Sequence, residues 1–559
     1  MAKAVRKVGE KEVSIGGPVP QVKPGEKLVR RTASVCPVCY RLIPAIIVER
    51  DGKLYIRKVC PEHGETEELY RGAFLDMYNK FMKFYTTRSY LQNPIFDAGR
   101  PCPYNCGLCP LHMSHTGLLN IVVTNRCDLS CRYCFFYAER AGFVYEPTID
   151  QIREMIRTAH KQGIRAKAIQ LTGGEPTMRD DLVEIVRAVR EENITHVQLN
   201  THIIRLAYDY ELTRKLREAG VNTVYMSFDG VTPNVNTKNH REVPYFFENA
   251  RKAKMTSLVL VPTVIRGRNT DQLGAIIEFA ARNMDVVRSV NFQPVSLVGQ
   301  MKRHERERYR ITIPEVIKLI EEQTNGQIPH DARYPVPAAA VISEFIAAFT
   351  GKAQPAFTSH PVCGAGTYVY VERKGDEIKY IPITAFVDVD GLLERMMKVA
   401  EDFKAGRISK SRFLVKGIYE LEKFVDKRKQ PKGIDIIKML YKIIVRHDYS
   451  TLGEFHYRFL FLGMMHFQDP YNYDVDRVRR CVIHYGTPDG RVIPFCAFNV
   501  FPELYRDYIQ KEFSIPLEER EKEHGKTEKY VRSQELIKKL ESGEPYIKHY
   551  KPFRHLRKK

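Results

Sequence analysis

The sequence contains no apolar run long enough to cross a membrane. Its longest runs, LVLVPTVI at 258–265 and FLFLGMM at 459–465, fall far short of the ~20 residues that a spanning helix needs. The N-terminal MAKAVRKVGEKEVS carries charge but no apolar segment, so it shows no secretory signal. No long internal repeat and no aromatic-stacking motif of an RNA-recognition module is visible. We therefore expect a cytoplasmic protein without a nucleic-acid partner.

Acidic residues are outnumbered by basic ones, 67 to 88, which gives a formal net charge of +21. Such an excess favours an anionic partner, for example a nucleotide cofactor, a nucleic acid or an anionic lipid head group. Part of the excess lies in HYKPFRHLRKK at 549–559, which we expect to be a frayed, solvated tail. Charge alone does not identify the partner.

Between residues 117 and 300, short apolar strands alternate with amphipathic helices. The expected strands are 118–124, 166–173, 196–202, 223–230, 257–265 and 287–295. Six β-then-α repeats predict a parallel sheet, and a partial (β/α)6 barrel fits because the pattern stops near residue 300. Function is then expected at the carboxyl ends of the strands.

A chain of 559 residues predicts more than one domain. We expect a small N-terminal metal-binding hairpin module at 1–95, turning at Asp51-Gly52, and a more helical stretch at 73–91. The α/β barrel and a preceding cysteine loop occupy 96–305, and a mainly helical region occupies 306–559. In that last region we predict helices at 311–326 and 333–351, a strand-like segment at 367–383, a buried helix at 454–469 and a hairpin at 481–496.

The chain has twelve cysteines, and nine of them fall in three short clusters before residue 135. Disulfides would suit a secreted protein, but in a cytosolic chain such clustering indicates metal sites. The first cluster, Cys36, Cys39, Cys60 and His63, has spacing that suits tetrahedral zinc or a rubredoxin-like single iron. The alternative there is a bare hairpin with buried thiols.

Cys127, Cys131 and Cys134 follow the first barrel strand in a C-x3-C-x2-C arrangement. Three thiolates would leave one iron of a [4Fe–4S] cluster open to a substrate or cofactor. The spacing alone also permits a zinc knuckle, or a fully ligated cluster with a distant fourth cysteine. The second strand ends in LTGGEPT at 171–177, where glycines expose the backbone to a ligand and Glu175 can pair with an ammonium group.

The same spacing recurs in CPYNCGLCP at 102–110, without a preceding strand or a GGEP partner. We therefore expect Cys102, Cys106 and Cys109 to hold an auxiliary cluster, with a zinc site as the alternative, and His112 or His115 could add a ligand. The remaining thiols, those of Cys363, Cys481 and Cys496, flank turns and could converge on a second auxiliary cluster. Isolated cysteines are more often small core residues.

The C-x3-C-x2-C motif, with Tyr133 before its last cysteine, and the GGEP motif together resemble the radical S-adenosylmethionine (SAM) superfamily. The resemblance implies that SAM chelates the open iron through its amino and carboxylate groups. It implies that the amino group is held by Gly173, Gly174 and Glu175, and that Asn200, Ser227 and Asp229 contact the ribose or carboxylate. One electron from a low-potential donor would cleave SAM to a 5′-deoxyadenosyl radical, which must be shielded from solvent.

The order CPVC, CPEHG, CPYNCGLCP, NRCDLSCRYC, LTGGEP and HYGTPDGRVIPFCAFN resembles the archaeal tetraether synthases. This resemblance implies one SAM-binding and two auxiliary [4Fe–4S] clusters, a mononuclear iron, an archaeal diether phospholipid substrate and peripheral contact with the membrane surface. Two SAM-derived radicals per bond would join the ends of phytanyl chains. Phe, Leu and Met of 454–469 could then line a tunnel for alkyl chains.

Two other interpretations stay open. One is a radical SAM C-methylase of a pterin-type cofactor or another small molecule. The other is a non-enzymatic iron–sulfur electron carrier or an RNA-binding zinc-ribbon protein. The GGEP motif argues against the non-enzymatic interpretation, because neither kind of protein has a use for a SAM pocket.

Overall fold

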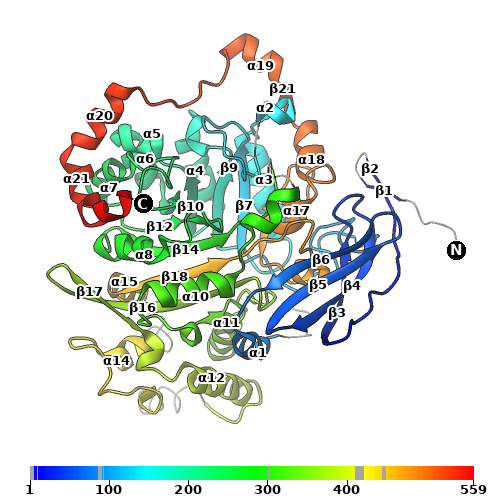
Figure 1. Ribbon diagram of the computed structural model, residues 1–559, viewed down its shortest axis with the longest axis horizontal. Coiled ribbons are helices and arrows are strands. Elements are labelled where there is room, and N and C mark those ends of the chain that lie inside the picture. The colour runs from blue at the N-terminus through cyan, green and yellow to red at the C-terminus, as the bar shows by residue number, and fades with distance from the viewer. Residues whose placement is uncertain are drawn as a thin grey trace.

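The computed structural model describes residues 6–8, 11–85, 91, 93–97, 99–136, 138–299, 301, 303–409, 421–442 and 449–558. A barrel-like sheet with helices on its outer face forms the centre of the molecule (Figure 1). A separate antiparallel N-terminal sheet lies on one side of the barrel, and the C-terminal helices α20 (Gln534–Ser542) and α21 (Glu544–Tyr550) lie on the other (Figure 1). The cysteine clusters are thereby distributed over a barrel and its N-terminal neighbour.

The predicted partial barrel is confirmed. Among the described residues, six parallel strands pair in chain order: β7 (Leu118–Thr124), β9 (Ala168–Gly173), β10 (His196–Thr201), β11 (Val221–Ser227), β12 (Leu258–Val261) and β14 (Val287–Pro294). Helices that connect them include α3 (Ile149–His160), α4 (Leu182–Glu191), α6 (Tyr210–Ala219), α7 (Val243–Lys252) and α8 (Leu273–Arg282). Their apolar stripes cover the sheet, and a Thr148–Gln151 capping box starts α3.

The sheet continues at both edges with strands from the C-terminal region. Next to β14 lies β18 (Phe459–Met465), followed by the antiparallel β16 (Gly364–Lys374) with β17 (Glu377–Pro382). Next to β7 lies β19 (Ile483–Gly486), paired with the antiparallel β20 (Val492–Pro494). The hairpin prediction at 481–496 is confirmed. The divisions 1–95, 96–305 and 306–559 stay proposed ones, since the last region contributes strands to the barrel sheet.

The buried helix predicted at 454–469 is wrong for most of its length. The helix α15 (Tyr449–Arg458) ends at Arg458, and the run FLFLGMM is strand β18 between β14 and β16. A short apolar run buried on both faces fits a helix or an interior strand equally well by its pattern. Pairing with β14, far away in sequence, decides the matter, and the run is therefore part of the sheet.

The rest of the C-terminal region is mainly helical, as predicted. Its described helices include α10 (Ile313–Gln323), α11 (Ala338–Thr350), α12 (Val389–Lys404), α14 (Ile436–Leu440), α16 (Val475–Arg479), α17 (Phe495–Val500), α18 (Arg506–Glu512), α19 (Leu517–His524), α20 (Gln534–Ser542) and α21 (Glu544–Tyr550). None of the helices that the structure describes is both long and apolar enough to span a bilayer.

The C-terminal tail is ordered, which contradicts the expectation of a frayed end. After α21 a 3-10 helix covers Lys551–Lys558. Tyr550 and Phe553 are each 1% exposed, and the Tyr550 ring stacks on His240 with centroids 3.9 Å apart. Aromatic side chains between the lysines and arginines therefore anchor this basic segment against α7 and α8.

The N-terminal sheet contains the predicted hairpin. Strands β4 (Leu42–Arg50) and β5 (Lys53–Cys60) turn at Asp51-Gly52, where both residues have positive φ, and β3 (Lys27–Val35) and β6 (Gly64–Arg71) complete the sheet. The helix α1 (Leu75–Met82) confirms part of the predicted 73–91 stretch, whose residues 86–90 lie outside the described residues.

Asp474, fully buried, joins this N-terminal sheet to the segment that leads to Cys481. Its carboxylate accepts hydrogen bonds from Thr32 (2.7 Å) and Tyr70 (2.8 Å) and pairs with Arg30. Burial would raise the pKa of Asp474, but the Arg30 guanidinium and these donors lower it well below its usual range. The ion pair is thus charged in the folded protein and fixes the N-terminal sheet on the barrel.

We expect Asp474→Asn to lower the free energy of unfolding by about 3 kcal/mol, because the largely buried Arg30 loses its nearer counter-ion and keeps only Asp476, at 3.4 Å. Calorimetry should show a lower Tm. The matched control is Asp376→Asn, which removes a fully exposed carboxylate 3.6 Å from Arg282 and should change Tm little. Equal Tm values for the two variants would refute the role of Asp474.

Candidate active site

The loop after β7 carries the central cysteine motif. The backbone N–H groups of Leu129 and Phe136 lie 3.4 and 3.3 Å from the sulfur atoms of Cys127 and Cys134, respectively. Burial raises the pKa of all three motif thiols, that of Cys131 to about 11. Such thiols become thiolates readily only when a positive group binds them, and the irons of a metal cluster are such a group. The donor set therefore fits a thiolate-ligated iron–sulfur cluster.

The two glycines of the GGEP motif allow β9 to approach this loop. Gly174 donates to the carbonyl of Thr124 (2.8 Å), and Glu175 donates to the carbonyl of Arg126 (2.7 Å). A Cβ on Gly173 would lie 2.0 Å from the Thr124 oxygen, and one on Gly174 would lie 2.0 Å from the Arg126 oxygen. Side chains at these positions would push the strand end away from the cysteine loop. The glycines thus allow the strand end to contact the loop through its backbone, and they also line the cavity.

The carboxylate of Glu175 is almost completely buried and held by several donors. The hydroxyls of Thr177 and Thr201 each lie 2.7 Å from Oε1, and the backbone N–H of His202 lies 2.8 Å from Oε2. The His202 Nε2 atom lies 2.6 Å from Asp128 and 3.3 Å from Glu175. Burial would lower the pKa of His202, but the two carboxylates outweigh it and raise that pKa. His202 therefore joins the GGEP carboxylate to the cysteine loop.

A partly enclosed cavity of about 220 Å³ lies at the carboxyl ends of the barrel strands. Its lining brings together most of the predicted site residues: Cys127, Cys131, Cys134, Tyr133, Gly173, Gly174, Glu175, Asn200 and Ser227. Residues that sequence reasoning missed also line it, namely His202, Lys238, Gln170, Gln293, Ser296, Phe467, Tyr485 and Phe495. Tyr485 and Phe495 lie in the HYGTPDGRVIPFCAFN segment and Phe467 lies in 454–469, but neither segment indicated a place in this cavity. The others come from strands and loops without a motif of their own, so only the fold identifies them.

Asp229 is placed behind the cavity wall. Its carboxylate accepts from the Tyr133 hydroxyl (2.7 Å), the backbone N–H of Thr263 (3.0 Å) and the ammonium of Lys238 (3.0 Å). Lys238 lines the cavity, whereas Asp229 does not. The contact of Asp229 with SAM stays a prediction, and Tyr133 and Lys238 are the partners through which its carboxylate reaches the cavity lining.

Two members of each group of predicted auxiliary cysteines lie in or against one apolar core, as does Cys134. That core includes Cys102, Cys106, Cys481 and Cys496, together with aromatic residues such as Tyr473 and Tyr485. Burial raises the pKa of Cys102 and of Cys496 to about 11 in each case. The cysteine groups are thus close neighbours in space although they are distant in sequence.

Cys363, Cys481 and Cys496 lie near one another. Burial raises the pKa of Cys481, and the neighbouring thiols of Cys496 and Cys363 raise it further. The buried guanidinium of Arg477 donates to the Cys363 sulfur at 3.3 Å and also interacts with Cys496. That these three thiols ligate one cluster stays a prediction, which the nearby cation suits.

His112 does not turn toward the neighbouring thiols. Its Nε2 atom lies 2.9 Å from the Cys481 carbonyl oxygen and 3.0 Å from Nε2 of His484. Burial lowers the pKa of His112 to about 4, so this ring is neutral at physiological pH. Both ring nitrogens of His115 are buried and lack a partner among the described residues. The geometry therefore gives no support to His112 as a ligand of Cys102, Cys106 and Cys109.

The N-terminal set Cys36, Cys39, Cys60 and His63 is assembled as predicted. Its ligand atoms all lie within 4.8 Å of one another, and Sγ of Cys39 is 3.9 Å from Sγ of Cys60. Burial would raise the pKa of Cys60, but hydrogen bonding from His63 and from backbone amides lowers it to about 7. Such spacing fits one tetrahedral ion, with metal–sulfur distances of ~2.3 Å for zinc.

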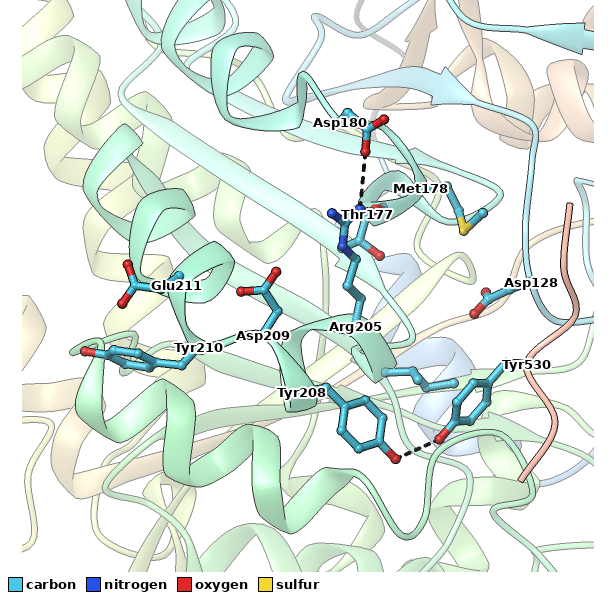
Figure 2. A pocket seen from close by; sticks show the side chains of 11 residues that line it. Asp128, Thr177, Met178, Asp180, Arg205, Tyr208, Asp209, Tyr210, Glu211 and Tyr530 are labelled. Atoms are coloured by element: carbon cyan, nitrogen blue, oxygen red, sulfur yellow. Dashed lines mark hydrogen bonds and ion pairs between the residues drawn. The ribbon is translucent and has the colours of Figure 1, made fainter. Parts of the chain in front are cut away.

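A larger depression, of about 870 Å³, opens at the surface beside Asp128 (Figure 2). Tyr208 and Tyr530 meet across it through their hydroxyls, 2.8 Å apart (Figure 2). The segment between α19 and α20 crosses the cysteine loop here: Lys529 donates to the Cys127 carbonyl (2.8 Å) and the Tyr530 N–H donates to the Asp128 carbonyl (3.0 Å). This segment covers the outer side of the loop, whereas the reactive groups face the smaller cavity.

Comparisons with known proteins agree with this geometry. The family model described as Radical SAM superfamily matches residues 121–280, and the one described as HMPTM N-terminal zinc ribbon domain matches residues 28–72. The chain is 43% identical over 503 residues to the 7,8-dihydro-6-hydroxymethylpterin dimethyltransferase of Methanocaldococcus jannaschii, covering 89% of this chain and 97% of that protein. It is 28% identical to the GTP 3′,8-cyclase of Marinobacter nauticus, covering 36% of this chain and 61% of that protein.

Likenesses to solved structures are weaker. The crystal structure of Streptococcus suis SuiB aligns with a TM-score of 0.30 and 16% identity, covering 38% of this chain and 47% of that chain. Methylornithine synthase (PylB) aligns with a TM-score of 0.27 and 18% identity, covering 37% of this chain and 64% of that chain.

The comparisons contradict the prediction of a tetraether lipid synthase that acts on a diether phospholipid. The relative that covers nearly the whole chain is named for a pterin and for methyl transfer. The zinc-ribbon family that matches the N-terminal module is likewise named HMPTM. Membrane contact, which rested on the lipid interpretation, loses its support as well. The chain belongs to the radical SAM superfamily and, within it, to the family of the 7,8-dihydro-6-hydroxymethylpterin dimethyltransferase of M. jannaschii.

Proposed function

We propose that this protein is a radical SAM enzyme that methylates carbon atoms of a reduced pterin. The observation that carries the proposal is the partly enclosed cavity, where three thiols and the buried Glu175 carboxylate face one space at the strand ends. The named activity of the relative that shares 43% identity supports the choice of a pterin.

Cys127, Cys131 and Cys134 hold the SAM-binding cluster in this proposal. With SAM bound, that cluster would supply, on one-electron reduction, a radical able to remove hydrogen from an unactivated carbon. Glu175 receives the ammonium group of SAM, and the donors around its carboxylate hold it in orientation. Tyr133, Asn200 and Ser227 line the remainder of the SAM subsite, with Asp229 acting through Tyr133.

The far wall of the cavity suits a flat heteroaromatic substrate. Phe467 and Phe495 stack there with centroids 3.9 Å apart, and Gln170, Gln293 and Ser296 add polar groups from the ends of β9 and β14. A pterin has a planar ring with hydrogen-bond donors and acceptors along its edge, which such amides can match. The cavity walls also limit the access of water to a reactive radical.

The other cysteines complete the proposed cofactor set. Cys102, Cys106 and Cys109 hold one auxiliary [4Fe–4S] cluster, and Cys363, Cys481 and Cys496 hold a second, with Arg477 offsetting its charge. Their shared core with Cys134 supports a path for electrons from a low-potential donor. The N-terminal set holds a single zinc or iron ion.

Anaerobic reconstitution with iron and sulfide, followed by addition of SAM, reductant and reduced 6-hydroxymethylpterin, tests the function. We expect mass spectrometry to detect 5′-deoxyadenosine and a pterin heavier by one or two methylene units. The Cys131→Ala variant should give neither product, because its loop has lost a cluster ligand. Reactions without SAM or without pterin are the controls. Formation of 5′-deoxyadenosine without a methylated pterin would refute the substrate and leave the radical chemistry standing.

Glu175→Gln should raise the Kd for SAM roughly tenfold to a hundredfold, because a charge-assisted hydrogen bond worth about 1.5–3 kcal/mol is lost. Equilibrium dialysis with radiolabelled SAM measures the change. The control is Glu191→Gln, which removes an exposed carboxylate on α4 that pairs with Arg153. An unchanged Kd in Glu175→Gln would exclude this carboxylate from the SAM subsite.

Cys39→Ser should lower the metal content by one ion per chain, because a thiolate ligand is removed from the N-terminal set. Elemental analysis distinguishes zinc from iron and gives the stoichiometry. Val38→Ser changes the same turn at an exposed position and should keep the ion. Equal metal content in the two variants would show that the thiols are a bare, metal-free cluster.

A further inference from the structure

Lys238 is a largely buried cation beside the cysteine loop, and it belongs to none of the motifs visible in the sequence. Its side chain is 12% exposed, and its Nζ atom lies 4.8 Å from the centroid of the Tyr133 ring. Because Tyr133 stands between Cys131 and Cys134 in the chain, this contact brings the ammonium group against the loop that carries both sulfur atoms. Lys238 lines the same partly enclosed cavity as the thiols.

The cation is fixed in place on both sides. Its ammonium pairs with Asp229 at 3.0 Å, and Asp229 in turn is held by Tyr133 and Thr263. The Lys238 carbonyl accepts from Arg532 at 2.5 Å, so the C-terminal segment anchors its backbone. Burial would lower the pKa of Lys238, but Asp229 outweighs it and raises that pKa, which keeps the side chain charged.

The same charge acts on the sulfur atoms. The Lys238 ammonium is close enough to interact electrostatically with the sulfur atoms of Cys131 and Cys134, which line the same cavity. For Cys134, Lys238 acts together with Arg506. A positive charge that stabilises a thiolate also stabilises further negative charge on the atoms bound to that thiolate.

We propose that Lys238 sets the reduction potential of the SAM-binding cluster by stabilising its reduced form. Three thiolates make the ligated cluster anionic, and one-electron reduction adds another negative charge beside the ammonium group. The potentials of such clusters depend on net charge, hydrogen bonding and exposure. Asp229 offsets part of this effect, so the net charge beside the cluster depends on both members of the Lys238–Asp229 pair. The inference rests on the proposed assignment of Cys127, Cys131 and Cys134 as cluster ligands.

The test is an anaerobic redox titration of the full-length, reconstituted protein, monitored by the electron paramagnetic resonance signal that changes when SAM is added. An external low-potential reductant supplies the electron. In Lys238→Met the ratio of reduced to oxidised cluster at a fixed potential should fall roughly tenfold, a shift of about 59 mV for a one-electron couple. Lys238→Arg, which keeps the charge, should restore the original potential. Asp229→Asn, which removes the offsetting carboxylate, should shift the potential in the opposite direction.

Iron and sulfide analysis of each variant shows whether the cluster is retained. Lys161→Met is the matched control, because it removes an exposed lysine on the barrel's outer face and should leave the potential unchanged. A Lys238→Met protein with an intact cluster and an unchanged potential would overturn the proposal. If Lys238→Met fails to hold a cluster, an unchanged potential in Asp229→Asn overturns it. Absence of any SAM-responsive signal in the unmodified protein would instead refute the cluster assignment, and failure to methylate a pterin would leave this titration valid.

Discussion

The close backbone contact between the end of β9 and the cysteine loop is the constraint on which the rest of the site depends. Gly174 and Glu175 donate to carbonyls of Thr124 and Arg126, and a Cβ on either glycine of the motif would lie 2.0 Å from a carbonyl oxygen. Because this contact fixes the start of the loop, it also fixes the Glu175 carboxylate relative to the sulfur atoms. The two parts of the motif are thus one structural unit, even though about forty residues separate them.

Charge balance is the second constraint, because thiols and carboxylates are buried together around one cavity. Glu175 and Asp128 are offset by His202, and Asp229 is offset by Lys238. Arg477 has the same relation to Cys363. A buried anion without such a partner would be neutralised by protonation, and a protonated thiol is a poor metal ligand. The buried cations therefore belong to the site as much as the motif residues do.

Sequence reasoning recovered the barrel and the motifs because both depend on local signals. Strand and helix periods determine the six β/α units, and three closely spaced cysteines remain close in any fold. Long-range pairing carries no such signal, so the strand at 459–465 was assigned to a helix and the ordered C-terminal tail to solvent. His202 and Lys238 were missed for the same reason: each is an isolated polar residue whose partners come from other segments. The substrate was predicted wrongly, because the order of the cysteine motifs along the chain indicates the cofactors more directly than the molecule that reacts.

The extension of the barrel sheet explains how the cysteines of the SAM-type motif come close to Cys481 and Cys496, which are far away in the sequence. The strand β19 pairs with β7, the strand that leads into the SAM-type motif, and the β19–β20 hairpin lies between Cys481 and Cys496. Tyr485 of β19 packs in the same core as Cys134 and Cys496. A tilt of β19 against β7 would move both cysteine groups relative to each other, whereas the paired strands hold them in register. The hairpin is thus the structural link by which a proposed auxiliary cluster and the radical site can keep a fixed separation, and a fixed separation is what electron transfer between two buried centres requires.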